Sequence, residues 1–289
     1  MLRRIAFFGA GVFLAGFVRI AGAQEPPSPA PIHVYADAID RKGARMLPDL
    51  SMLAAYIDGK PTRVLSVQPA ESEKLLFAVM VDISSSGREQ QKLLKDAAAK
   101  IFAALTNQNG TGYLVLFNNQ TYVTKQPVQP AEADAILDHA SFTGATSLYD
   151  AVAQIASGVL SKSQNPGTPR RVIVVLSDGK DNYSNLTLDA AEKSVQREGV
   201  TVFMLSQLSG DAASKGEYVI DELTRSSGGR GMEDGMMLNK VPALINAIQS
   251  QIELTIVPAQ AIGGKLHSLS IKTTQKSIAI TAPAAIPIP

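Results

Sequence analysis

The chain contains no cysteine among its 289 residues. This absence excludes a disulfide framework, a thiolate nucleophile and a cysteine-ligated zinc site. It also argues against a lipid anchor of the bacterial lipoprotein kind, which needs a cysteine near the cleavage point. Histidine is scarce as well, and His33, His139 and His267 lie in three separate segments. We therefore interpret the histidines as surface or strand residues rather than as metal ligands or catalytic bases.

Charged side chains make up only 18% of the sequence, and the two signs nearly balance. The first 23 residues hold three of the 27 basic side chains and no acidic one. Without them, 24 basic residues stand against 26 acidic residues, a net charge of about −2. Because no basic cluster remains, the composition argues against a nucleic-acid-binding protein.

Residues 1–23 have the pattern of a secretory signal peptide. Two arginines precede an apolar run from Ile5 to Val18, and Ala21-Gly22-Ala23 supplies the small residues of a cleavage site. An uncleaved signal anchor is the alternative, but the run is short for a membrane span and Arg19 interrupts it. No later segment is long and apolar enough to span a membrane. We expect an exported protein, periplasmic or secreted.

Strand-like segments lie on both sides of the middle of the chain. Residues 24–31 are predicted to form a proline-rich tether, and residues 32–70 an N-terminal β segment with a hairpin turn at residues 58–61. Residues 253–281 are predicted to form a C-terminal β segment, and residues 282–289 a proline- and alanine-rich tail that frays. Because three short strands alone bury little surface, we predict that the two flanks pair in one small β-sandwich-like module. Two independent β appendages are the alternative. The expected strands of the flanks are Ile32–Ala38, Met52–Ile57, Thr62–Val67, Leu254–Val257, Leu266–Ile271 and Ser277–Ile280.

Between the flanks, residues 74–252 alternate between strand and helix. The run Leu75–Val81 has seven apolar residues, which suits a central parallel strand covered by helices on both faces. Repeated βα units of this kind predict an α/β fold with a doubly wound, mainly parallel sheet. The expected strands are Leu75–Val81, Tyr113–Phe117, Thr121–Thr124, Val172–Leu176 and Val200–Leu205. The expected helices are residues 88–109, Ala131–Asp138, Leu148–Leu160, Leu188–Glu198, Tyr218–Ser226 and Val241–Gln251.

Three loops at one edge of this sheet carry oxygen-bearing side chains. Asp82, Ser84 and Ser86 follow the first strand. Residues 143–147 precede the helix at Leu148, and residues 178–181 follow a later strand. Because ligands bind beyond the carboxyl ends of strands in open α/β sheets, we expect these side chains to converge. Two carboxylates and three hydroxyls suit a small hard cation such as Mg²⁺ and leave one position for water or a ligand oxygen. The candidate metal ligands are Asp82, Ser84, Ser86, Thr146 and Asp178. The candidate ligand-binding rim comprises Ser85, Gly144, Ser147, Gly179 and Asp181.

Each of these loops also has an ordinary structural explanation. Serine and threonine at helix starts commonly cap backbone N–H groups, and an Asp-Gly pair after a strand is commonly a turn. The occurrence of all three loops in this order, each at the expected edge, is more specific than any of them singly.

The three loops resemble the metal-ion-dependent adhesion site (MIDAS) of von Willebrand factor type A domains. The Asp-x-Ser-x-Ser motif of that family matches residues 82–86, its metal-contacting threonine matches Thr146, and its later aspartate matches Asp178. The resemblance covers about residues 75–252. It implies a binding module that holds a divalent cation, and not a catalyst.

The chain is also similar to exported bacterial proteins of the von Willebrand factor A-related type described from Acidobacteria. Their Glu/Asp-Gly-Lys turn is matched by Ile57–Lys60, their helix start by Thr146–Ala151, and their Gly-Gly-Arg turn by Ser227–Arg230. Two features depart from the pattern. Ser85 stands where the family often has glycine, which costs loop freedom but removes no ligand. The aromatic ending often seen at the C-terminus is missing.

From these observations we expect an adhesion-type protein-binding module that depends on a divalent cation. The cation would be Mg²⁺, with Mn²⁺ or Ca²⁺ as alternatives, and a protein partner would supply an Asp or Glu carboxylate. A structural interaction module with a non-functional metal site is the alternative. A hydrolase is less favoured, because Ser84 stands where phosphoryl-transferring folds place a second carboxylate after Asp82. The sequence also has no Gly-x-Ser-x-Gly elbow and no phosphate-binding lysine loop.

Overall fold

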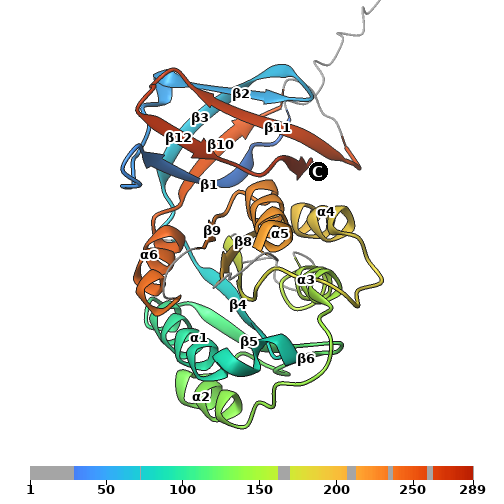
Figure 1. Ribbon diagram of the computed structural model, residues 1–289. Coiled ribbons are helices and arrows are strands. Elements are labelled where there is room, and N and C mark those ends of the chain that lie inside the picture. The colour runs from blue at the N-terminus through green and yellow to red at the C-terminus, as the bar shows by residue number, and fades with distance from the viewer. Residues whose placement is uncertain are drawn as a thin grey trace, which may run out of the picture.

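The computed structural model of the chain describes residues 29–71, 73–161, 170–206, 213–233, 237–258 and 263–288. The predicted signal peptide, residues 1–23, and residues 24–28 of the predicted tether lie outside the described residues. The described chain forms an α/β part and a separate antiparallel sheet, which lies at the top of Figure 1.

A six-stranded central sheet organises the α/β part. Its strands are parallel except at one edge, where β6 runs antiparallel to β5. The mainly parallel sheet that the sequence predicts is therefore present. In spatial order the strands are β6 (Thr121–Val123), β5 (Thr111–Phe117), β4 (Leu75–Asp82), β7 (Arg170–Leu176), β8 (Val200–Leu205) and β9 (Gly231–Met232).

Helices cover both faces of the central sheet, and the apolar run of β4 explains why. All eight residues of β4 are buried. Phe77, Val79 and Val81 point into one hydrophobic cluster, and the alternate residues Leu76 and Met80 point into the other. One face is covered by α1 (Gln91–Thr106), α2 (Pro130–Asp138) and α6 (Met237–Gln249), and the other by α3 (Leu148–Ser157), α4 (Leu188–Glu198) and α5 (Ala213–Ser226).

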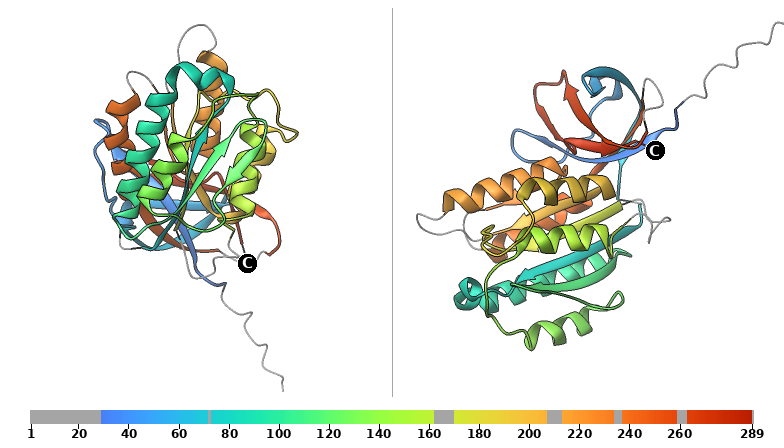
Figure 2. Two further views of the ribbon diagram at one scale, coloured as in Figure 1. Left: turned by 90° about the horizontal axis from the view of Figure 1, so that it is seen from below. Right: turned by 90° about the vertical axis from the view of Figure 1, so that its right-hand side faces the viewer.

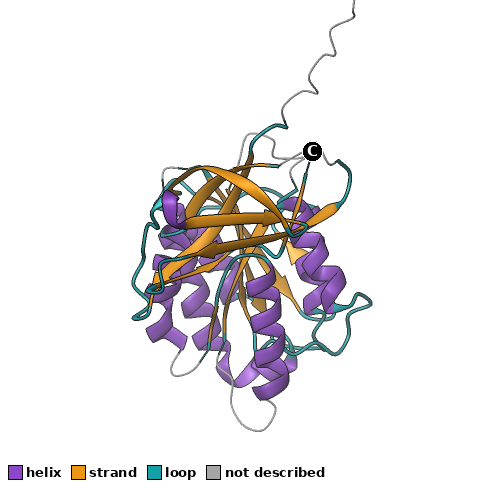
Figure 3. Cartoon of the chain, turned by 90° about the horizontal axis from the view of Figure 1, so that it is seen from above, coloured by secondary structure: helices purple, strands orange, loops and turns teal. Residues whose placement is uncertain are grey.

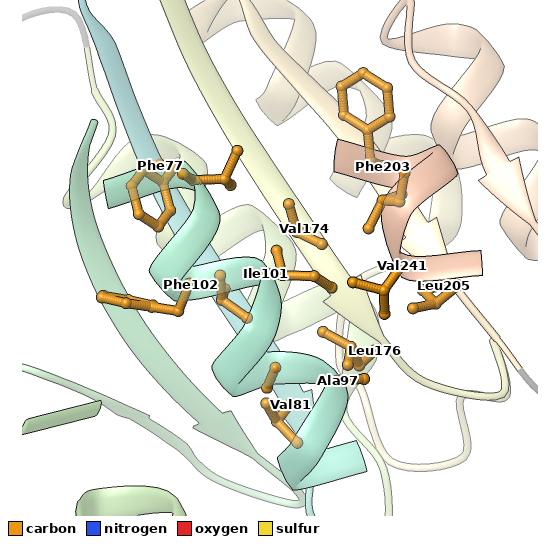
Figure 4. Close-up of a cluster of buried hydrophobic side chains, with 14 of the residues drawn as sticks. Phe77, Val81, Ala97, Ile101, Phe102, Val174, Leu176, Phe203, Leu205 and Val241 are labelled. Carbon is orange, nitrogen blue, oxygen red and sulfur yellow. The ribbon is translucent and has the colours of Figure 1, made fainter. Parts of the chain in front are cut away.

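Figure 4 shows the first of these clusters, in which side chains of β4, β7 and β8 meet those of α1 and α6. The rings of Phe77 and Phe102 pack edge to face, with 5.2 Å between their centroids. Val241 of α6 lies against Leu205 and Leu176 in the same layer. The core thus packs α1 and α6 side by side on one face of the central sheet.

Strands of both flanking segments pair with each other in one seven-stranded antiparallel sheet, here called the curled sheet (Figures 1, 2 and 3). This confirms that the flanks pair with each other, but they form one sheet rather than two facing sheets. Consecutive strands β11 and β12 pair with β2 and β1, which are three places apart in the sheet, so the sheet curls to allow their short connection. In spatial order the strands are β12 (Ile278–Thr281), β1 (Ile32–Asp40), β10 (Ile252–Val257), β3 (Lys60–Pro69), β2 (Leu53–Ile57), β11 (Leu266–Thr273) and β13 (Ala285–Pro287).

The hairpin turn predicted between β2 and β3 is confirmed. Asp58 and Gly59 both have positive φ, +50° and +74°, and Ile57 pairs with Lys60. A two-residue loop in which both residues have positive φ has a backbone twist that matches the right-handed twist of the flanking strands. Two short 3₁₀-helices lie elsewhere in the described chain, at η1 (Leu50–Met52) and η2 (Ser85–Gln90).

The expectation of a frayed tail is wrong. Residues Ala285–Pro287 form β13, which pairs with β11, and Ile286 and Ile288 are buried. Alternate isoleucines give the tail one apolar face, and this pattern outweighs the prolines because β13 lies at the edge of the sheet, where a missing N–H costs little.

Several predicted helix boundaries also shift. The last helix of the α/β part includes Met237, whereas the sequence suggested a start at Val241. Pro242 lies inside α6. Helix α5 includes Ala213, five residues before the predicted start, and α3 ends at Ser157 rather than Leu160.

Both connections to the curled sheet meet the central sheet at its amino edge. Arg170, the first residue of β7, is buried and donates to the carbonyl oxygen of Ala70 (3.2 Å) and to Oε1 of Gln251 (3.2 Å), one in each connection. It also bonds the carbonyl oxygen of Ile248 at the end of α6. The carboxyl edge, where β4 ends at Asp82, is therefore the opposite edge. Among the described helices, none combines the length and the apolar character that a bilayer crossing requires.

Candidate metal centre

Asp82 ends β4 as a buried carboxylate, with only 3% of the residue exposed. Its Oδ1 accepts a hydrogen bond from the backbone N–H of Ser84 at 2.9 Å, and its Oδ2 accepts one from Ser177 Oγ at 2.8 Å. Both oxygens point beyond the end of the strand, because Ser84 and Ser177 belong to the loops that follow β4 and β7. Each oxygen keeps lone pairs for a further partner.

The two serines of the first loop lie beside each other. Ser84 Oγ and Ser86 Oγ are 3.0 Å apart. An octahedral Mg²⁺ site with ligand distances of about 2.1 Å has neighbouring oxygens about 3 Å apart. The spacing of the two hydroxyls therefore fits two adjacent ligands of one ion.

The loop that contains Thr146 runs alongside the first loop. Thr143 N–H donates to the carbonyl oxygen of Ile83 at 2.8 Å, and Ser85 N–H donates to that of Gly144 at 3.0 Å. Gly144 has φ +85°, and a Cβ there would lie 2.5 Å from Asn119 Oδ1. Only glycine lets the loop pass this close. Thr146 itself is buried, and its N–H donates to Asn182 Oδ1 at 2.9 Å.

The third loop places Asp178 at the same edge. Register pairs Val81 of β4 with Leu176 of β7, so Asp82 and Ser177 are neighbours and Asp178 follows directly. Asp178 accepts from the backbone N–H of Lys180 at 3.1 Å and forms an ion pair with Lys180 Nζ at 3.1 Å.

Hydrogen bonds thus join each pair of the three loops. Ser177 links the third loop to the first, Ser85 links the first to the second, and Asn182 links the second to the third. The five predicted ligands therefore lie at one edge of the central sheet, as the sequence pattern predicts. A cavity of about 170 Å³ opens there, and its walls include Asp82, Ser86 and Asp178. Ser84 and Thr146 do not line it.

The residues present fit a divalent cation. Burial, together with the charge of Asp178, raises the pKa of Asp82 to about 6, although hydrogen bonds from Ser84 and Ser177 lower it. Two like charges in a buried site are a cost that a divalent cation removes. Among the described residues, no group of three or more His, Asp or Glu side chains is placed to hold a metal. The predicted ligands are two carboxylates and three neutral hydroxyls, and such hard oxygen atoms are the type of ligand that Mg²⁺ takes.

The predicted rim residues differ in their exposure to solvent. Ser85 and Gly144 are exposed. Ser147 is buried and donates its N–H to the carbonyl oxygen of Asn118 at 2.8 Å, and Gly179 is buried too. Asp181 accepts from Ser184 Oγ at 2.6 Å and from the Tyr149 N–H at 3.1 Å, so it satisfies the amino end of α3.

Sequence reasoning missed three residues that shape the site. Ser177 donates to Asp82, Lys180 pairs with Asp178, and Asn182 holds Thr146. The sequence did hold a signal for Ser177, because parallel pairing of β4 with β7 places its hydroxyl next to Asp82. Nothing in the sequence indicated Asn182, because its contact depends on the path of two loops. Further lining comes from Gly87, Glu89, Gln90, Leu94 and Met237.

Comparison with known proteins decides the family. A family model described as the von Willebrand factor type A domain matches residues 78–227, more than half of the chain. The chain belongs to this family. The closer resemblance to the Acidobacterial type remains a prediction, and no curated protein matches this von Willebrand factor type A domain protein.

Three solved structures are similar to this von Willebrand factor type A domain protein at low identity. A von Willebrand factor type A protein from Catenulispora acidiphila has 10% identity and a TM-score of 0.50, over 92% of this chain and 74% of that one. An aerotolerance-related membrane protein from Bacteroides fragilis has 16% identity and a TM-score of 0.48, over 60% and 98%. Proximal thread matrix protein 1 from the mussel byssus, solved with a zinc-occupied MIDAS motif, has 16% identity and a TM-score of 0.49, over 61% and 48%. The chain thus spans about half of the mussel protein.

Proposed function

We propose that this chain binds a divalent cation at the carboxyl edge of the central sheet and uses it to bind a carboxylate of a protein partner. The observation that carries the proposal is the cross-linked set of three loops, which brings Asp82, Ser86 and Asp178 to one cavity. Membership of the von Willebrand factor type A family supports an interaction role rather than catalysis.

Each residue of the site has a distinct part in this proposal. Asp82 and Asp178 balance the charge of the ion, and Ser84, Ser86 and Thr146 add neutral oxygens, directly or through water. Ser177 and the Ser84 N–H hold the Asp82 carboxylate in one orientation. When bound, Mg²⁺ (or Mn²⁺ or Ca²⁺) supplies an acceptor position for a partner's Asp or Glu oxygen. Since the two ligand carboxylates only balance the charge of the ion, the ion can still attract that third carboxylate.

Isothermal titration of Mg²⁺ into the full chain tests the metal site. We expect saturable heat from the parent protein and none from Asp82→Asn, which keeps the shape of the side chain but removes its charge. The control is Asp134→Asn, an exposed carboxylate on α2, which should bind Mg²⁺ as the parent does. Equal binding by Asp82→Asn and the parent, or no heat from either, would instead favour a structural interaction module with a non-functional site.

We also propose that the protein is exported, periplasmic or secreted, on the basis of the pattern in residues 1–23. The N-terminal sequence of the protein recovered from envelope and culture fractions tests this. A chain beginning near Gln24 supports cleavage, whereas an intact Met1 in a membrane fraction supports an uncleaved anchor.

A further inference from the structure

A second, larger cavity adjoins the metal cavity on the side of α4 and α5. It is a groove of about 820 Å³, bounded by the loop after β7, by α4 and by α5. These two helices lie next to each other in Figure 1, at the right of the central sheet. We call this cavity the α4–α5 groove. Its size is that of sites that hold small ligands or peptide side chains.

Apolar and aromatic side chains dominate the lining of the groove. Tyr149, Leu186, Leu188, Tyr218 and Val219 contribute to its walls. Tyr218 is 61% exposed and Leu186 is 41% exposed, although most large apolar side chains of this domain are buried. Exposed tyrosine is typical of protein-binding surfaces, since its ring supplies contact area at low entropic cost and its hydroxyl stays hydrated.

The groove carries an excess of negative charge. Asp189, Glu192 and Glu222 line its helical walls. Asp189 pairs with Lys193, and Glu222 pairs with Arg225. Within the described part of the chain, nothing forms a hydrogen bond or ion pair with Glu192, which is half buried.

Burial, followed by the charges of Glu222 and Asp189, raises the pKa of Glu192, although the charges of Arg225 and Lys193 lower it. A cationic group from outside would relieve this repulsion. Of the two lysines in the groove, Lys180 is already paired with Asp178, and Lys215 is exposed on α5. Asp181, which also lines the groove, is occupied by Ser184 and the amino end of α3.

The groove and the metal cavity share one lining residue. Lys180 lines both cavities. Gly179, beside it, has φ +74°, and a Cβ there would lie 2.6 Å from the carbonyl oxygen of Gly216. The close contact of this loop with α5 fixes the separation between the metal site and the groove. A single extended segment of a partner could therefore contact both.

We propose that the α4–α5 groove binds a second part of the same partner segment that brings a carboxylate to the metal. The segment is an extended peptide that places an aliphatic or aromatic side chain against Tyr149 and Tyr218 and a Lys or Arg beside Glu192. This inference rests on the proposed function and adds to it the chemistry of the partner: one acidic residue, followed or preceded by an apolar and a basic residue.

The test uses synthetic fluorescein-labelled peptides with blocked ends and the full chain. Each peptide carries one Asp and one Leu-Arg pair, joined in either order by Gly/Ser spacers of increasing length, and matched peptides replace Asp with Asn or Arg with Gln. Fluorescence anisotropy in Mg²⁺ and in EDTA measures binding to the parent protein, to Glu192→Lys and to Tyr218→Ser. Asp134→Lys on α2 is the control for the change of charge, and Tyr122→Ser on β6 is the control for the loss of an aromatic ring. Both positions are exposed and lie away from the groove.

We expect at least one spacer length to bind in Mg²⁺, with an affinity that Glu192→Lys lowers about tenfold. Tyr218→Ser should lower it too, and the two controls should not. The Gln-substituted peptide should be insensitive to Glu192→Lys, which assigns the effect to the charge pair.

Two failures are distinguishable. Peptide binding that needs Mg²⁺ and Asp but ignores both groove variants would overturn the groove and leave the proposed function standing. Saturable heat on titration with Mg²⁺, without binding of any Leu-Arg peptide, would have the same two consequences. Binding that ignores EDTA but is lost in Glu192→Lys would keep the groove and overturn the metal-bridged mechanism.

Discussion

Arg230 reaches from the α/β part to Asp37 on β1 of the curled sheet. Its Nε donates to Asp37 Oδ2 at 2.9 Å, and its Nη2 contacts the same oxygen. Asp37 is only 3% exposed, whereas the Arg230 side chain is 27% exposed. Because Gly228 and Gly229 just before Arg230 pack against Pro283 and Val202, the guanidinium is presented from a fixed turn. This ion pair therefore ties the two parts of the molecule together.

Arg230→Met should lower the free energy of unfolding by about 2 kcal/mol, because it leaves the buried Asp37 carboxylate without its counter-charge. Urea denaturation followed by circular dichroism measures the change. Arg225→Met is the matched control, since Arg225 pairs with Asp221 and Glu222 on the exposed face of α5. That loss should stay below about 1 kcal/mol. Equal effects of the two variants would mean that the Asp37 contact does not couple the two parts.

The destabilisation by Arg230→Met should depend on pH. Burial raises the pKa of Asp37 above its usual value of 3.8, and Arg230 opposes that rise. Without Arg230 the folded-state pKa rises further above the unfolded-state value. Such a group favours folding at low pH, and its contribution is lost as the pH rises through the folded-state pKa. The difference between variant and parent should therefore be largest near neutral pH and shrink toward about pH 4. A difference that is constant across this range would contradict the assignment to Asp37.

Periodicity in the sequence predicted the central sheet well because its strands are buried on both faces. The run Leu75–Val81 can be satisfied only by two covering layers, and β4 has them. Periodicity predicted the edges of the fold less well. Ala285–Pro287 looked like a frayed tail because its prolines outweighed its isoleucines, yet β13 needs only the pairing with β11 and a place for Ile286. The curling of the flanking sheet depends on the short connection from β11 to β12. The residue pattern of a single strand does not predict this curling.

The sequence likewise predicted some features of the candidate site and not others. Motif spacing located Asp82, Thr146 and Asp178, since each follows or precedes a predictable element. Their supporting contacts depend on how loops distant in sequence pass each other. Ser177 was adjacent to a predicted ligand and still overlooked, because its role follows from the register between β4 and β7.

Ser177→Ala should lower Mg²⁺ affinity about tenfold, because residues that orient a metal ligand commonly contribute that much. The hydroxyl donates to Asp82 Oδ2 at 2.8 Å and holds the carboxylate in place. Calorimetric titration of Mg²⁺ measures the effect. Ser157→Ala is the control, because Ser157 Oγ donates only to a backbone carbonyl in α3. An unchanged affinity in Ser177→Ala would show that Asp82 does not depend on this hydrogen bond.

Thr146→Val removes only a hydroxyl, because valine has nearly the same shape as threonine. If Thr146 supplies an oxygen to the ion, directly or through water, affinity should fall at least about tenfold. Thr143→Val tests the same change in the same loop, at an exposed position, and should bind Mg²⁺ as the parent does. Equal affinities of the two variants would restrict the site to the first and third loops.

Lys180→Met should raise Mg²⁺ affinity. Lys180 Nζ lies 3.1 Å from Asp178 Oδ2, and Lys180 lines the cavity whose walls include Asp82 and Asp178. The ammonium group and a metal ion therefore compete for the same carboxylate, and the lysine also repels an incoming cation. Because the Lys180 side chain is 41% exposed, solvent screens the pair, and the gain should be about threefold. Lys92→Met on the exposed face of α1 removes the same charge far from Asp178 and should leave the affinity unchanged. If Lys180→Met instead weakened Mg²⁺ binding, the lysine would be a support of Asp178 rather than its competitor, and release of Asp178 from Lys180 could not be part of metal binding.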